Sequence, residues 1–270
     1  MDRDRAGLII MDISGVYGTE SFYKGRDAVW VDLKGVPGMN CYCDEEAEQE
    51  IMEKIRNLGP EGVHFLDSGN YHYMSKLWMQ LLEEDFELLV FDHHTDMQPP
   101  MFGDILSCGG WIKAALDSNP HLRRVYLAGP PADAAGQAEV KAYGDRVAWI
   151  GEEDMKREGA LGKCLEGGNL PLYLSVDKDI LGTGYARTNW DQGNVSLDTV
   201  LAWIHEAGAC RRIIGMDVCG ENPEGTGMKG PGSDEAGDSF RDAQINDSAN
   251  RKLLYSFLEL ETYESIIRSL

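Results

Sequence analysis

Eight short apolar runs are spread along the chain, and they constrain its fold more than any other feature of the sequence. They are Leu8–Ile13, Val29–Leu33, Val63–Leu66, Leu88–Phe91, Val125–Ala128, Val147–Ile150, Leu172–Val176 and Ile213–Met216. Each run is too short to cross a membrane as a helix. Short runs that are almost continuously apolar are typical of strands buried on both faces of a parallel sheet.

Stretches with helical spacing of apolar residues separate many of these runs. They are Glu45–Leu58, Met74–Glu84, Ile105–Asp117, Asp133–Tyr143 and Leu197–Ala207, and a closing helix is expected over Asn250–Leu270. This alternation predicts an α/β fold with a mostly parallel sheet and helices on both faces. No linker-like composition divides the 270 residues, so we expect one domain over 1–270. The glycine-rich segment Glu221–Asp238 is expected to form a long loop near the site.

Composition excludes several classes of partner. A formal net charge of −21 argues against nucleic acids, whose phosphates require a basic surface. Six cysteines in a chain of this length do not indicate a disulfide framework, and no apolar secretory segment precedes the first run. We therefore expect a cytoplasmic protein that binds neither nucleic acid nor membranes and acts on a small molecule.

Acidic and imidazole side chains follow four of the apolar runs. Ligands of open parallel sheets bind beyond the carboxyl ends of the strands, so these residues should share one face. They are Asp67 with His72, Asp92 with His94 and Asp96, Asp177 with Asp179, and Asp217. Alternate side chains of extended backbone point the same way, which lets the two D-x-D-like groups converge.

Four carboxylates packed together would repel one another by several kcal/mol, and two dications would compensate that repulsion. Oxygen-rich ligands with two imidazoles suit Mn²⁺ better than Zn²⁺. Simpler interpretations stay open at this point. Asp and His are ordinary turn residues, so a lone D-x-H-x-D is weak evidence, and His72 could instead pack under Trp78.

Three segments together resemble the ureohydrolase (arginase and agmatinase) family. Residues 92–96, Asp-His-His-Thr-Asp, are similar to its D-A-H-x-D motif, and residues 175–179, Ser-Val-Asp-Lys-Asp, resemble its S-x-D-x-D motif. Residues 69–72 stand where the family has a glycine-rich segment that ends in a ligand histidine. Order and spacing agree across roughly residues 60–225.

The resemblance implies a three-layer α/β/α fold with a sheet of about eight strands, and two Mn²⁺ ions per chain. His72 and Asp96 would hold one ion, His94 and Asp179 the other, and Asp92 and Asp177 would bridge both. The implied activity is hydrolysis of a linear C–N bond in a guanidino or amidino compound. A water shared by the two ions would be the nucleophile, as the metal-bridging hydroxide.

The sequence departs from the family pattern at positions that surround the substrate in family members. Cys108 occupies the position of a histidine that helps proton transfer in arginases, and it is either a proton shuttle or an inert buried thiol. The family's guanidinium-binding glutamate, three residues beyond Asp217, is Gly220 here, with Glu221 next. A one-residue bulge would return Glu221 to the site. We therefore predict Asp92, Asp177 and Cys108 as catalytic residues and Glu221, His93 and Asn222 as substrate-binding residues, with a packed His93 as the alternative.

Two other functions remain open. One is an amidohydrolase acting on acylated amines, as in the related deacetylase branch, although that branch uses one zinc and lacks the full ligand set. The other is an arginase-like metal-binding protein without ureohydrolase activity. The resemblance also leaves a homo-oligomer open, since family members are often trimers or hexamers.

Overall fold

The computed structural model describes residues 7–157, 159–223 and 235–269, and its centre is a sheet of eight parallel strands. Their order across the sheet is β2 (Val29–Asp32), β1 (Leu8–Asp12), β4 (Gly62–Phe65), β10 (Ile213–Cys219), β9 (Leu172–Asp177), β5 (Phe86–Phe91), β7 (Leu122–Gly129) and β8 (Val147–Gly151). All eight predicted runs form these strands. Those from β4 to β7 are almost entirely buried, which explains their apolar sequences.

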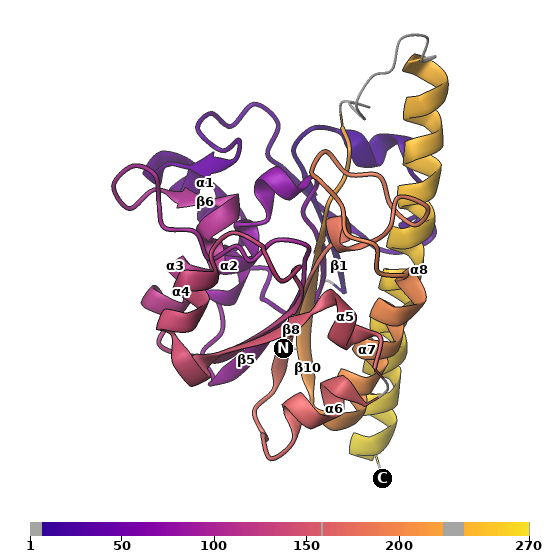
Figure 1. The fold of residues 1–270 in the computed structure, drawn as a ribbon. Helices are drawn as coiled ribbons and strands as arrows, with labels where there is room; N and C mark the ends of the chain where they lie inside the picture. Colours follow the sequence, from indigo (N-terminus) through magenta and orange to yellow (C-terminus); the bar gives the residue numbers. More distant parts are fainter. Residues whose placement is uncertain (1–6, 158, 224–234, 270) are drawn as a thin grey trace.

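Helices cover both faces of this sheet (Figure 1). On one face lie α1 (Glu45–Ile55), α2 (Met74–Met79), α3 (Trp111–Ser118) and α4 (Gln137–Ala142). On the other lie α5 (Glu152–Met155), α6 (Ala160–Leu165), α7 (Leu197–Cys210) and α8 (Glu235–Ser269). Alternate residues of the strands point to opposite faces of the sheet and contribute to two separate hydrophobic cores. Ile9 packs with the first helical layer and Ile10 with the second. The predicted three-layer α/β/α fold is thereby confirmed.

Several helix bounds differ from those predicted. The stretch predicted as a helix from Ile105 begins with a short strand, β6 (Leu106–Ser107), which pairs antiparallel with β3 (Tyr42–Cys43); the helix starts only at Trp111. The final helix begins at Glu235, 15 residues before the predicted start at Asn250. Its added part buries Asn246 against polar groups, so it lacks the apolar periodicity that predicts a helix. The predicted loop Glu221–Asp238 lies mostly outside the described residues, and its last four residues are helical.

Short 3₁₀ turns carry the chain across the carboxyl end of the sheet. They include η2 (Gly69–Tyr71), η3 (Cys108–Gly110) and η5 (Lys178–Ile180). The strands β4, β10, β9 and β5 are neighbours at the middle of the sheet, so the segments that follow them meet at one place. Within the described residues, no helix combines the length and apolar character needed to span a membrane.

Candidate metal centre

His72 is held at the carboxyl edge of the sheet by the turn η2 that follows β4. Its Nδ1 lies 3.0 Å from Oδ2 of Asp96 and 3.2 Å from Oδ2 of Asp92, both of which come from the segment after β5. All three side chains are buried, and their ligand atoms lie within 4.8 Å of one another. The structure therefore joins His72 to two aspartates that lie 20 and 24 positions later in the sequence, in one potential metal-binding triad.

A second triad shares Asp92 with the first. Nδ1 of His94 lies 2.8 Å from Oδ2 of Asp179 and 3.6 Å from Oδ1 of Asp92. Asp179 comes from η5, directly after β9. Asp92 thus offers one carboxylate oxygen to each triad, the arrangement expected of a ligand between two cations.

Asp177, the other predicted bridging residue, lies at the end of β9 beside the first triad. Its Oδ2 is 3.6 Å from Nδ1 of His72 and accepts a hydrogen bond from the Cys219 thiol at 3.2 Å. Cys219 was not predicted as a site residue. The apolar pattern ended at Met216, but β10 continues to Cys219, so it is Cys219 that reaches the carboxyl edge. Asp217, predicted at that edge, instead lies inside the sheet and accepts hydrogen bonds from Tyr173 at 2.7 Å and from buried His64.

The electrostatics of this cluster fit divalent cations. Burial, followed by the charge of Asp92, raises the pKa of Asp96 to about 6, and the same two causes raise the pKa of Asp177. Burial and the charge of Asp177 raise the pKa of Asp179 well above its usual range. These shifts express the cost of burying several carboxylates and of placing them side by side, and cations would relieve both.

Unpartnered atoms support the same conclusion. Although Nδ1 of His72 and Oδ2 of Asp92 lie 3.2 Å apart, neither makes a hydrogen bond of acceptable geometry. Buried polar atoms are rarely left in this state, and a cation between them would satisfy both. The donor set of carboxylates and imidazoles therefore fits a metal.

The outer nitrogen of each imidazole is also held. Nε2 of His72 lies 2.8 Å from Oγ of Ser175, and Nε2 of His94 lies 3.1 Å from Oδ1 of Asp191. Such contacts fix the ring orientation and direct Nδ1 toward a metal. Nothing in the local sequence of Asp191 reveals this contact with His94, which only the fold brings about.

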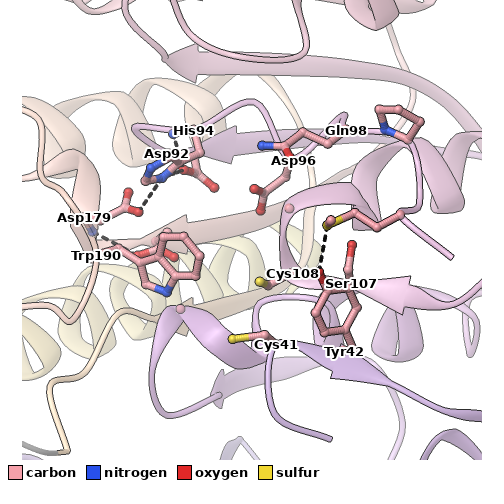
Figure 2. Close-up of a pocket in the computed structure, with 15 residues that line it drawn as sticks. Cys41, Tyr42, Asp92, His94, Asp96, Gln98, Ser107, Cys108, Asp179 and Trp190 are labelled. Carbon is pink, nitrogen blue, oxygen red and sulfur yellow. Dashed lines mark hydrogen bonds and ion pairs between the residues drawn. The ribbon is translucent and has the colours of Figure 1, made fainter.

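A pocket of about 310 Å³ opens above the cluster (Figure 2). Its charged lining consists of Asp92, His94, Asp96, Asp177 and Asp179. We call the remaining lining residues the pocket wall: Cys41, Tyr42, Gly69, Gln98, Pro99, Met101, Ser107, Cys108, Gly109 and Trp190. Gly69 is required here, because a Cβ atom would come within 2.9 Å of both Asp177 and Trp190.

Cys108 lines this pocket, and it does so beside Cys41, which was not predicted. The pairing of β3 with β6 places the two cysteines opposite each other, and the amide of Cys108 donates to the carbonyl of Cys41 at 2.9 Å. Their thiols share a hydrogen bond, which lowers the pKa of Cys41 to about 7 and raises that of Cys108. Cys41 is also the less buried of the two thiols.

The three predicted substrate-binding residues lie outside the pocket lining. Glu221 is fully buried in an ion pair with Lys178, on the side of η5 that faces α8. Asn222 is buried and donates to Asp242 at 3.3 Å. The amide of His93 donates to Oδ1 of Asp179 at 3.0 Å, while its ring packs edge-on to His94.

Three solved structures share this fold along nearly the whole chain. Formiminoglutamase of Trypanosoma cruzi with Mn²⁺ has a TM-score of 0.66 at 12% identity, covering 95% of both chains. Formimidoylglutamase of Bacillus subtilis has a TM-score of 0.65 at 13% identity, covering 92% of this chain and 86% of its own. Proclavaminate amidino hydrolase of Streptomyces clavuligerus has a TM-score of 0.65 at 12% identity, covering 95% and 94%.

Sequence comparison identifies the family. An uncharacterized protein of Thermotoga maritima is 32% identical over 214 residues, which are 78% of each chain. The model of the arginase family matches residues 43–230, a segment that holds every residue of both triads. The chain therefore belongs to the arginase family, whose members are metal-dependent hydrolases of non-peptide C–N bonds.

Proposed function

We propose that this chain is a binuclear Mn²⁺-dependent hydrolase of a guanidino or amidino compound. The observation that carries the proposal is the pair of triads, His72–Asp92–Asp96 and Asp92–His94–Asp179, which share one carboxylate. In this proposal the first triad binds one ion and the second binds the other. Asp177, whose Oδ2 lies 3.6 Å from Nδ1 of His72, would complete the ligand set.

Manganese is favoured over zinc by the composition of the ligand set. Four carboxylates and two imidazoles supply mostly oxygen ligands, which suit Mn²⁺ and other octahedral ions. Four negative charges also balance two divalent cations. The T. cruzi formiminoglutamase, which shares the fold, is described with Mn²⁺.

The ions, when bound, would supply Lewis acidity that activates water for attack on the central carbon of the substrate. The protein's own residues position that carbon, because the pocket opens directly over Asp92 and Asp177. Trp190 limits the space on one side, with its indole fixed by a 2.9 Å hydrogen bond to Asn70. The leaving amine needs a proton, and the Cys41–Cys108 pair is the candidate donor in the wall, with Cys41 the more readily titrated member.

Metal analysis and a substrate panel test the proposal. The purified chain, stripped with chelator and reloaded with Mn²⁺, should bind two ions per chain and release urea or ammonia from a member of the panel. Asp92→Asn removes the shared ligand and should lower turnover by more than about 100-fold, since even outer hydrogen-bond partners of ligands contribute 10–100-fold. Asp198→Asn, on the exposed start of α7, is the matched control and should behave as the unmodified chain.

A second candidate is an arginase-like metal-binding protein without ureohydrolase activity. The burial of Glu221 against Lys178 favours it, because the glutamate nearest to the family's guanidinium-binding position lies outside the pocket lining. Two bound Mn²⁺ ions with no turnover of any guanidine or amidine would support this candidate. One zinc per chain with turnover of acylated amines would instead support the amidohydrolase alternative.

A further inference from the structure

The pocket wall differs from the metal cluster below it in charge. Among the described residues that form the wall, no side chain is a carboxylate, an ammonium or a guanidinium. With two divalent cations bound, the four carboxylates of the cluster would be neutralised. The described part of the wall therefore offers a ligand no carboxylate, ammonium or guanidinium.

Two carboxylates near the site, Glu221 and Asp191, already have partners. The carboxylate of Glu221 is enclosed by Lys178, Asn246 and Asn250, and it is 0% exposed. Asp191 faces Nε2 of His94, a position from which it orients a metal ligand. Neither is placed to pair with a charged group at the far end of a substrate.

The rim of the pocket is apolar and exposed. Met101 is 71% exposed and Trp190 is 38% exposed, although both line the pocket. The Tyr42 hydroxyl contacts the sulfur of Met101 at 3.2 Å, so the rim continues into the wall. In Figure 2, Trp190 lies on one side of the pocket and Tyr42 on the other. Large apolar side chains that stay exposed around a concave site are typical of ligand-binding surfaces.

We infer that the substrate is a guanidine or amidine whose remaining part is short and uncharged, with apolar or aromatic character. This inference rests on the proposed function and adds the class of the substrate tail. An uncharged tail can bury against Trp190, Met101 and Tyr42, whereas an ammonium or carboxylate tail would lose hydration without gaining a partner of opposite charge among the described wall residues. The volume of about 310 Å³ is near the lower limit of ligand pockets, which indicates a small molecule.

The net negative charge of the chain works against the expected preference for an uncharged tail. A net charge of −21 attracts cations in general, so non-specific attraction would favour a cationic tail over a neutral one. Preference for a neutral tail therefore has to come from the pocket. Measurements at about 0.15 M salt reduce the general attraction, because charges are then screened over about 8 Å.

Three guanidines with the same four-carbon tail provide the experiment: n-butylguanidine, 4-aminobutylguanidine and 4-guanidinobutanoate. With the Mn²⁺-loaded full chain, kcat/KM for n-butylguanidine should exceed both other values by about tenfold or more. Calorimetric binding should follow the same order. Turnover of either charged compound at an equal or higher kcat/KM would overturn the inference.

Charge placed in the wall gives an independent test. Gln98→Glu adds a carboxylate to the lining with little change in shape, so preference should shift toward 4-aminobutylguanidine by about tenfold. Gln80→Glu makes the same change at an exposed position remote from this pocket, and its preference should not change. Equal shifts in both variants would overturn the inference.

Failure of the proposed function is distinguishable from failure of this inference. If none of the three compounds is hydrolysed, the hydrolase proposal fails. The relative binding affinities of the three compounds then still test whether the pocket prefers an uncharged tail. Tighter binding of n-butylguanidine would then support the inference. Tighter or equal binding of a charged compound, or no detectable binding of n-butylguanidine, would refute it.

Discussion

Lys178 lies between the predicted metal ligands Asp177 and Asp179, and its substitution by methionine should weaken both the fold and the metal centre. Its ammonium and the carboxylate of Glu221 form an ion pair in which both side chains are 0% exposed. Removing one partner of a buried pair costs about 3–5 kcal/mol, because the other charge stays buried without compensation. Two amides, Asn246 and Asn250, each donate to Glu221 at 2.8 Å. They offset part of the loss, so we expect Lys178→Met to lower the free energy of unfolding by about 2–4 kcal/mol.

A double-mutant cycle isolates the pair. Glu221→Gln should also destabilise the fold, since Lys178 then exchanges its paired carboxylate for a neutral amide and keeps Asn250 Oδ1, at 2.9 Å, and the charge of Glu20. The double variant has no buried charge from this pair, so its loss should be smaller than the sum of the two single losses by about 2 kcal/mol. Urea unfolding of the metal-free chain at pH 7 measures all three. Lys113→Met, which breaks the partly exposed pair with Asp117, should cost under about 1 kcal/mol.

The same variants examine the role of Glu221. In the structure this residue stabilises the segment that carries Asp177 and Asp179, so Glu221→Gln should weaken Mn²⁺ binding together with stability. A substrate-binding role, which the sequence predicts, requires a different result. Additive losses in the cycle, or a Glu221→Gln variant of normal stability and Mn²⁺ affinity with a raised KM, would refute our reasoning.

Two further variants test separate features of the structure. Asp191→Asn removes the carboxylate that holds Nε2 of His94, so it should weaken Mn²⁺ affinity by about tenfold in a calorimetric titration. An unchanged affinity would show that this exposed contact contributes nothing to metal binding. Burial raises the pKa of Asp67 from 3.8 to about 6, so the folded state binds this proton more tightly than the unfolded state does. The stability of the unmodified chain relative to Asp67→Asn should therefore fall by up to about 3 kcal/mol as the pH rises from 4 to 7, most of it between 4 and 6. Urea unfolding at four pH values measures the difference, which should stay constant if Asp67 titrates normally.

The strands were predictable from the sequence, while several helices were not. Strands buried on both faces require continuous apolar runs, and such runs can be recognised directly in the sequence. Helices α5 (Glu152–Met155) and α6 (Ala160–Leu165) have too few turns to show a period. Within α8, Asn246 and Asn250 are buried because they contact Glu221 and Lys178, and such polar burial gives no apolar periodicity.

The clustering of the predicted metal-ligand residues could be anticipated from the sequence, because each follows a strand or turn at the carboxyl edge of the sheet. The side chains around them could not be anticipated, since their positions depend on contacts between distant segments. Cys41 reaches Cys108 only through the pairing of β3 with β6, two segments more than 60 residues apart. Cys219 was not predicted, because the charge of Asp217 suggested that the strand ended before it. Asp217 in fact lies inside the buried strand, where hydrogen bonds from His64 and Tyr173 satisfy its carboxylate.

Gly220 shows why motif spacing alone could not locate Glu221. It stands where the family pattern has the guanidinium-binding glutamate, and its φ of +91° is one that other residues rarely adopt. A Cβ atom there would lie 2.6 Å from Oδ1 of Asp177 and 2.8 Å from the amide nitrogen of Lys178. Gly220→Glu, which restores the family residue, should therefore displace Asp177 and reduce bound Mn²⁺, measured by metal analysis after desalting, without increasing turnover of guanidines. Increased turnover with both ions retained would mean that the backbone after β10 adapts to a side chain. The departure from the family would then lie in one residue rather than in the path of the chain.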